Sequence, residues 1–164
     1  MNDQPILHAD DDDNDVIFLN YAFKQANITN RLYSLSGGEQ VVDYLSGQGE
    51  FADRALHPLP GLVLLDLKMP RLNGLETLSW IRAQPALRPL IVIIFTASAN
   101  QCDVDDAYRL GANSFLIKPA GTDRLTDLIK ALHAYWFGCN RFARLPVGDR
   151  LAAQAHYDET GLLS

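Results

Sequence analysis

The sequence predicts an α/β fold in which a parallel five-stranded sheet is covered by helices on both faces. Short β-branched or apolar runs alternate with longer stretches of helical period, which is typical of repeated strand-helix units. The third and fourth runs are continuously apolar rather than alternating, as central strands buried on both faces require. A length of 164 residues, with 48% hydrophobic and 21% charged residues, suits one globular domain with a single core.

Each expected element follows from a local pattern. Apolar side chains recur every three or four residues in the stretches 16–26, 75–82 and 125–132, as helices with one buried face require. Gly37-Gly38 opens a further helix, and Asn73 is a good N-cap for the helix after it. The expected strands are Ile6–Ala9, Leu32–Leu35, Gly61–Leu65, Leu90–Phe95 and Ser114–Ile117.

Two segments lack a clear period. Residues Gly47 to Pro60 combine Gly, Pro, Asp and His, and we expect an exposed loop there. After the last helix, the apolar run Tyr135-Trp136-Phe137 is equally suited to cover the core or to contact another subunit. We therefore divide the chain into a main domain at 1–138 and an extension at 139–164. The extension is too short to form a core, so we expect no output domain and a signal that leaves by protein-protein contact.

Composition argues against several function classes. The net charge of −6 offers no basic surface for a nucleic-acid backbone, so we expect no nucleic-acid binding. The apolar run Leu90–Phe95 is far too short to cross a bilayer, and we expect a cytoplasmic protein without membrane contact. Cys102 and Cys139 have no metal-site spacing, and we expect reduced structural thiols of the kind usually buried as small apolar groups.

Polar residues that could bind ligands or react follow four of the expected strands. Asp10 and Asp11 come after the first strand, Asp66 after the third, Thr96 after the fourth and Lys118 after the fifth. Side chains just past the carboxyl ends of parallel strands converge on one crevice, where ligands bind. The sequence therefore predicts that these residues form a single site.

Three converging carboxylates would repel one another unless a cation lay between them. Mg²⁺ prefers oxygen ligands and keeps several waters, so it suits this set. Asp66 is placed to attack a phosphoryl group as a carboxylate nucleophile and form an acyl phosphate. Lys118 can neutralise one phosphoryl oxygen, and the Thr96 hydroxyl can hydrogen-bond another.

Taken together, these motifs resemble the receiver domain of bacterial two-component response regulators. The resemblance covers Ile6 to about Trp136. Any one of the motifs would be weak evidence, but their order and spacing are specific. They are Asp10-Asp11, Leu64–Pro70 with Asn73-Gly74, Thr96-Ala97, Gly111-Ala112-Asn113 and Lys118-Pro119.

The resemblance implies a doubly wound, flavodoxin-like sheet of strand order 2-1-3-4-5. It also implies that Asp11 and Asp66 bind Mg²⁺ directly, that Asp10 acts through water, and that the backbone carbonyl of Lys68 completes the protein ligands. By the same pattern, Phe115 joins Thr96 as a switch residue.

The phosphoryl group would come from a sensor histidine kinase or a phosphotransfer protein, and an unidentified downstream protein would read the result. The long loop before the third strand and the Tyr135-Trp136 pair resemble the small regulators of phytochrome-type sensor kinases. In those relatives the extension supports dimers, so a homodimer is a further expectation here.

Simpler interpretations remain for some residues. An acidic run at a helix start is favourable beside the helix dipole, which suffices for Asp12, Asp13 and Asp15. Phe115 is equally consistent with an ordinary core residue. The histidines have no ligand spacing and none is expected at the crevice, so all are interpreted as structural or solvated. They are His8, His57, His133 and His156.

Two other functions share this fold class. A pseudo-receiver or constitutive adaptor would bind its partner without modification, although the complete motif set argues against it. A haloacid-dehalogenase-like phosphatase would also use an aspartate nucleophile on a parallel sheet. That class requires a second acid two positions after the nucleophile, where this chain has Lys68, and a cap insertion that we do not find.

Overall fold

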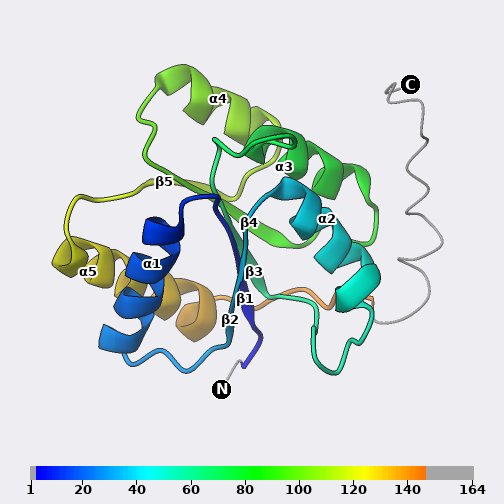
Figure 1. Cartoon of the computed structure of the whole chain (residues 1–164), viewed down its shortest axis with the longest axis horizontal. Coiled ribbons are helices and arrows are strands. Elements are labelled where there is room, and N and C mark those ends of the chain that lie inside the picture. Colours follow the sequence, from blue (N-terminus) through cyan, green and yellow to red (C-terminus); the bar gives the residue numbers. More distant parts are fainter. Residues whose placement is uncertain (1–2, 147–164) are drawn as a thin grey trace.

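The computed structural model describes residues 3–146. Its strands lie parallel in one sheet, and their bounds are Ile6–Ala9 (β1), Leu32–Leu35 (β2), Leu62–Leu65 (β3), Ile91–Thr96 (β4) and Ser114–Ile117 (β5). Their spatial order is β2-β1-β3-β4-β5, as Figure 1 shows. Both the strand order and the limits of the strands, to within one residue, confirm the prediction from sequence.

Helices cover both faces of this sheet. Their bounds are Asp13–Gln25 (α1), Gly38–Ser46 (α2), Gly74–Ala83 (α3), Gln101–Arg109 (α4) and Thr122–His133 (α5). In Figure 1, α1 and α5 lie together on one face, while α2, α3 and α4 lie on the other. Because the crossovers place helices on both faces, the carboxyl edge of the sheet is left open between the loops.

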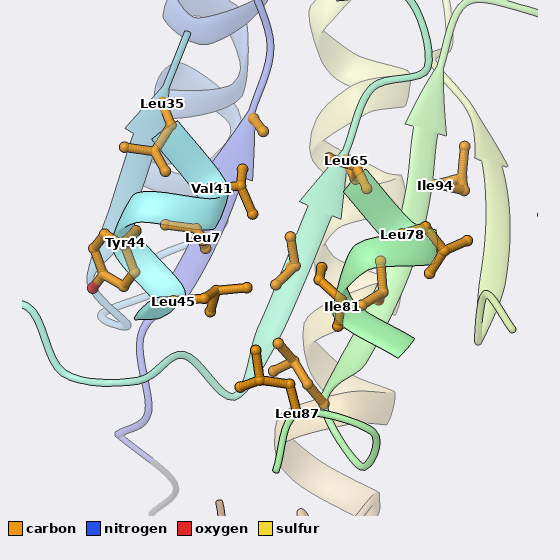
Figure 2. Close-up of a cluster of buried hydrophobic side chains, with 14 of the residues drawn as sticks. Leu7, Leu35, Val41, Tyr44, Leu45, Leu65, Leu78, Ile81, Leu87 and Ile94 are labelled. Atoms are coloured by element: carbon orange, nitrogen blue, oxygen red, sulfur yellow. The ribbon is translucent and has the colours of Figure 1, made fainter. Parts of the chain in front are cut away.

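Alternate residues of each strand point into two separate cores. In β3, Leu62 and Leu64 pack toward α1 and α5, whereas Val63 and Leu65 pack toward α2 and α3. Figure 2 shows the second of these cores, where Leu78 of α3 and residues of α2 meet the strands. Complete burial of all four β3 side chains explains why this run is continuously apolar.

Polar side chains fix where the helices begin. The Asp12 carboxylate accepts a hydrogen bond from the Asn14 backbone N–H and caps α1. At α3, Asn73 and Glu76 form a reciprocal capping box. The N-cap predicted at Asn73 is therefore confirmed, and α3 begins at a defined distance from β3.

The segment from Gly47 to Pro60 is a largely exposed loop, as predicted, but it is not entirely irregular or exposed. A 3₁₀ helix, η1, spans Gly49–Phe51, and Phe51 is buried in the core. The Arg54 guanidinium donates hydrogen bonds of 2.7 Å to the carbonyl oxygens of Tyr44 and Leu45. These bonds satisfy carbonyls at the end of α2, where no further helical turn exists to donate N–H groups to them.

At the carboxyl end, α5 continues into a π-helical turn, η2, at Ala134–Cys139. Within it Phe137 is buried, Trp136 packs partly against the α1–α5 core, and Tyr135 is exposed. The aromatic run thus covers the core with two of its members. A subunit contact through Tyr135 stays a prediction.

Residues 140–146, here called the strap, run from one face of the sheet to the other (Figure 1). Phe142 packs against the α1–α5 core and Leu145 against the opposite core. The strap also lines a cavity of about 530 Å³ together with Gln4, Gly61 and Leu90, which lie within two residues before β1, β3 and β4. It therefore lies at the amino edge of the sheet, and the domain boundary expected at 138 stays a prediction.

Two further observations concern composition. Cys102 and Cys139 are both free and exposed, so the expectation that they are buried thiols was wrong. Among residues 3–146, none of the helices combines the length and the apolar character needed to cross a membrane. His156 and the extension from residue 147 onward lie outside the described residues.

Candidate functional site

Carboxylates and a lysine from separate strand-helix units meet at the carboxyl edge of the sheet. Oxygen atoms of Asp10, Asp11 and Asp66 lie within 4.8 Å of one another. The Lys118 Nζ lies 2.5 Å from Asp10 Oδ2 and 3.6 Å from Asp66 Oδ2. Residues 108 positions apart in the chain are thus in direct contact, as the convergence of parallel strands requires.

Backbone hydrogen bonds extend the sheet ladder to the site residues themselves. The Asp10 N–H donates to Leu35 O at 3.0 Å, and the Asp66 N–H donates to Ala9 O at 3.0 Å. The Lys118 N–H donates to Thr96 O at 2.8 Å. These side chains therefore project from rigid positions rather than from free loops.

Asp10 is a buried and strongly stabilised carboxylate. Burial would raise its pKa, but the neighbouring His8 side chain, hydrogen bonds from Lys118 and from the Asp12 backbone N–H, and the Lys118 charge lower the pKa of Asp10 to about 2. The residue is only 2% exposed, so its carboxylate depends on these partners to stay charged. Asp10 consequently stays ionised at any physiological pH.

The environment of Asp66 has the opposite effect. Burial raises the pKa of Asp66, and the Asp10 charge adds to this rise, while Lys118 and the Thr96 hydroxyl oppose it. Its Oδ1 accepts a hydrogen bond of 2.8 Å from the Leu67 N–H. Its Oδ2 faces the Lys118 Nζ at 3.6 Å, which is beyond hydrogen-bond distance. One oxygen is therefore anchored, and the other faces a cation across a gap.

Gly74 fixes the loop that carries Asp66 into α3. A Cβ on Gly74 would lie 2.1 Å from the Asp66 carbonyl oxygen and 2.8 Å from the Leu67 Cα, so only glycine leaves room for this approach. The Gly74 N–H donates to Leu67 O at 2.9 Å and closes the loop. Lys68 lies inside this closed loop with its side chain exposed, so its backbone is constrained while its side chain is free of the core.

The remaining predicted site residues occupy different environments. Asp11 is exposed at the edge of the cluster. Thr96 is 1% exposed, and its Oγ1 accepts a hydrogen bond from the Ser98 N–H at 3.3 Å. Phe115 is half-buried and packs against the α2–α3 core, which fits both of the roles considered for it. The switch role of Thr96 and Phe115 stays a prediction.

Two residues that lie next to the site were not among the predicted site residues. Asp15, interpreted as a helix-dipole partner only, places Oδ2 2.7 Å from the Lys118 Nζ. His8, interpreted as structural or solvated, is buried beneath the site with Nε2 3.6 Å from Asp10 Oδ2. An acidic residue in a first helical turn is so common that its position alone did not indicate a tertiary partner. For His8, its position two residues before Asp10 in β1 placed it on the same side of the strand.

Comparison with known proteins agrees with this geometry. Residues 6–130 match the family model described as the response regulator receiver domain. The chain is 33% identical to a probable methanogenesis regulatory protein, FilR2, of Methanothrix harundinacea, over 83% of this chain and 85% of that protein. It is 30% identical to the response regulator Rcp1 of Synechocystis, over 80% of this chain and 87% of that protein.

Solved structures show the same relationship. A response regulator in red-light signalling of R. palustris superimposes with a TM-score of 0.78 at 36% identity, covering 88% of this chain and 99% of that one. The Mn²⁺-bound form of Rcp1 gives a TM-score of 0.76 at 28% identity, with 86% and 99% coverage. The family model alone spans most of the chain, and the relatives match it over most of their own length. This protein therefore belongs to the receiver-domain family of two-component response regulators.

Proposed function

We propose that this protein is a phosphorylation switch in which Asp66 accepts a phosphoryl group from a histidine kinase or a phosphotransfer protein. The observation that carries the proposal is the asymmetry of Asp66, whose Oδ1 is anchored by the Leu67 N–H while Oδ2 faces Lys118 across 3.6 Å. In the transfer, Asp66 Oδ2 forms a bond to phosphorus as the bond from phosphorus to the donor's histidine nitrogen breaks. The electron pair of the broken bond returns to the imidazole.

We further propose a Mg²⁺ site formed by Asp11, Asp66 and the backbone carbonyl of Lys68, with Asp10 acting through water. The clustering of three carboxylates within 4.8 Å supports it, because hard oxygen donors at this spacing suit a divalent cation. The ion would supply neutralisation of the charge on the phosphoryl oxygens. The Mn²⁺-bound form of the relative Rcp1 is consistent with such a site here.

Side chains of the protein would bind the remaining phosphoryl oxygens. Lys118 is positioned to pair with one phosphoryl oxygen, and the Thr96 hydroxyl with another. Burial of the site lowers the local dielectric and strengthens both interactions. Because Asp66 is consumed as the acceptor, the protein would catalyse only its own phosphorylation and dephosphorylation, without a separate substrate.

The output would be a change of surface read by another protein. A phosphoryl group adds about −1.5 to −2 charges at a buried position. Thr96 would move toward it, and the half-buried Phe115 ring would follow and reshape the surface of α4, β5 and α5. Similarity to the regulator of red-light signalling supports a phytochrome-type sensor kinase as partner. We place this partnership in the cytoplasm, and the exposed Tyr135 offers a contact for a homodimer.

The test is labelling by acetyl phosphate with Mg²⁺, followed by mass spectrometry of the intact protein. The wild type is expected to gain one phosphoryl group at Asp66 and to lose labelling when EDTA removes the metal. Asp66→Asn is expected to fold normally and to stay unlabelled. Labelling of this variant at another residue would contradict the proposal, and a partner that binds equally with or without phosphorylation would favour a constitutive adaptor.

A further inference from the structure

We propose that Asp15 is a positioning residue for Lys118, which it holds where a phosphoryl group on Asp66 would meet the ammonium. This inference rests on the proposed function of Asp66. It assigns a role in phosphorylation to a carboxylate that lies outside the cluster of three carboxylates described above.

The contacts of Lys118 use two of the three hydrogen-bond donors of its ammonium group. An ammonium has three N–H groups. Nζ lies 2.5 Å from Asp10 Oδ2 and 2.7 Å from Asp15 Oδ2, so two donors are engaged. The third direction leads to Asp66 Oδ2 at 3.6 Å. That gap is too long for a hydrogen bond but leaves space in which a phosphoryl oxygen on Oδ2 would meet the free donor.

Asp15 is held rigidly enough to act as an anchor. It lies in the first turn of α1, directly after the residues capped by Asp12. The helix in turn packs along α5 through Leu19, Ala22 and Phe23, which are buried. An acidic side chain in this turn is also favoured by the helix dipole, so the anchor sits on a stable element.

Without Asp15, the Lys118 ammonium could move into a neighbouring cavity. A cavity of about 110 Å³ lies beside Lys118 and is lined by Asp15, Phe18 and Phe95. The Phe95 ring already lies 5.7 Å from Nζ, so its face could attract the ammonium toward this space. Lysine is flexible along its stem, and loss of one ion pair would let Nζ move away from Asp66.

Asp10 cannot hold Lys118 alone in the proposed reaction. Its oxygens belong to the carboxylate cluster that would surround the metal, so they are shared between two cations. Among the described contacts of residues 3–146, the ion pair that Asp15 makes is with Lys118 alone. We therefore expect its contribution to appear in the transfer step rather than in metal binding.

The experiment compares Asp15→Ala with Asp13→Ala in the full chain. Asp13 lies two residues earlier on α1 and makes no ion pair with Lys118 among the described contacts, so the control removes the same charge. The rate constant of labelling by acetyl phosphate is measured at saturating Mg²⁺, and Mg²⁺ affinity is measured separately by calorimetry. Asp15→Asn, which keeps an acceptor oxygen, serves as a second variant if the alanine variant does not fold.

Asp15→Ala is expected to slow labelling about tenfold at saturating Mg²⁺, the factor that corresponds to about 1.4 kcal/mol of lost stabilisation. Mg²⁺ affinity is expected to stay within about twofold for both variants, since neither Asp13 nor Asp15 belongs to the carboxylate cluster. Charge alone predicts the reverse, because removing a negative group favours an anionic donor. A rate for Asp15→Ala equal to or faster than that of Asp13→Ala would overturn the inference.

The result also separates this inference from the function on which it rests. If the wild type were not labelled at Asp66, the proposed function itself would fail. If the wild type were labelled and Asp66→Asn were not, while Asp15→Ala behaved like Asp13→Ala, only the role of Asp15 would be refuted.

Discussion

Replacing Gly74 by alanine should disturb both the fold and the site, because the added methyl group would overlap backbone atoms of Asp66 and Leu67. Its Cβ would lie 2.1 Å from the Asp66 carbonyl oxygen and 2.8 Å from the Leu67 Cα. If the neighbouring atoms belonged to a side chain, that side chain could rotate away. They are backbone atoms of the loop that carries Asp66, so they cannot. Relief of the contact must therefore displace Asp66, or shift α3 away from β3.

The magnitude follows from the nature of the contact. Overpacking costs about 1–3 kcal/mol and more where backbone must move, so we expect about 3 kcal/mol here. At roughly 2–4 °C per kcal/mol for a chain of this size, the midpoint of thermal unfolding should fall by about 6–12 °C. Labelling by acetyl phosphate should fall as well, measured well below that midpoint so that all molecules are folded.

Gly37→Ala is the matched control. A Cβ on Gly37 meets nothing within 4 Å, and its φ of 179° is extended backbone that any residue adopts. This variant should unfold at the wild-type temperature and accept phosphate at the wild-type rate. Our reasoning would be refuted if Gly74→Ala matched Gly37→Ala in both measurements, since the loop would then adapt without strain.

Two further predictions concern stability. A chain ending at Pro146 should unfold about 4–8 °C above one ending at Gly138. The reason is that partial burial of Phe142 and Leu145 contributes roughly 2 kcal/mol to the free energy of unfolding. Equal midpoints in thermal scans would show that the strap does not stabilise the fold. In metal-free buffer, Asp10 should contribute roughly 2 kcal/mol that is present above pH about 4 and lost as the pH falls toward 2, since folding lowers its pKa from 3.8 to about 2. The free energy of unfolding of Asp10→Asn, measured by denaturant titration at several pH values, should lack this acid-dependent loss. The same dependence on pH in the wild type and the variant would contradict the lowered pKa of Asp10.

Much of the fold could be predicted because each local pattern agreed with the global arrangement. Continuous apolar runs marked the central strands, and Asn73 marked the start of a helix through its own side chain. The strand order came from the family resemblance, and the pairing of the strands confirmed it. Once the order was known, the meeting of Asp10, Asp66 and Lys118 followed from the geometry of parallel strands alone.

The features that sequence reasoning missed all depend on contacts between distant segments. The Asp15–Lys118 ion pair joins residues 103 positions apart, and nothing around Asp15 distinguishes it from Asp13. Arg54 caps α2 from a segment that has no period of its own, so its role appears only after the chain has turned back. The exposure of both cysteines likewise depends on which helix face each occupies, and their residue type suggested the reverse.

The origin of the site in separate strand-helix units has a consequence for quality control in the cell. Asp10, Asp66 and Lys118 follow the first, third and fifth strands, so a fragment that ends before β5 lacks Lys118. A nascent or partly unfolded molecule would have the acceptor carboxylate without the cation that faces it. If phosphorylation requires Lys118 as proposed, only a polypeptide folded through its fifth strand would accept the phosphoryl group, and incomplete copies would not compete for the donor.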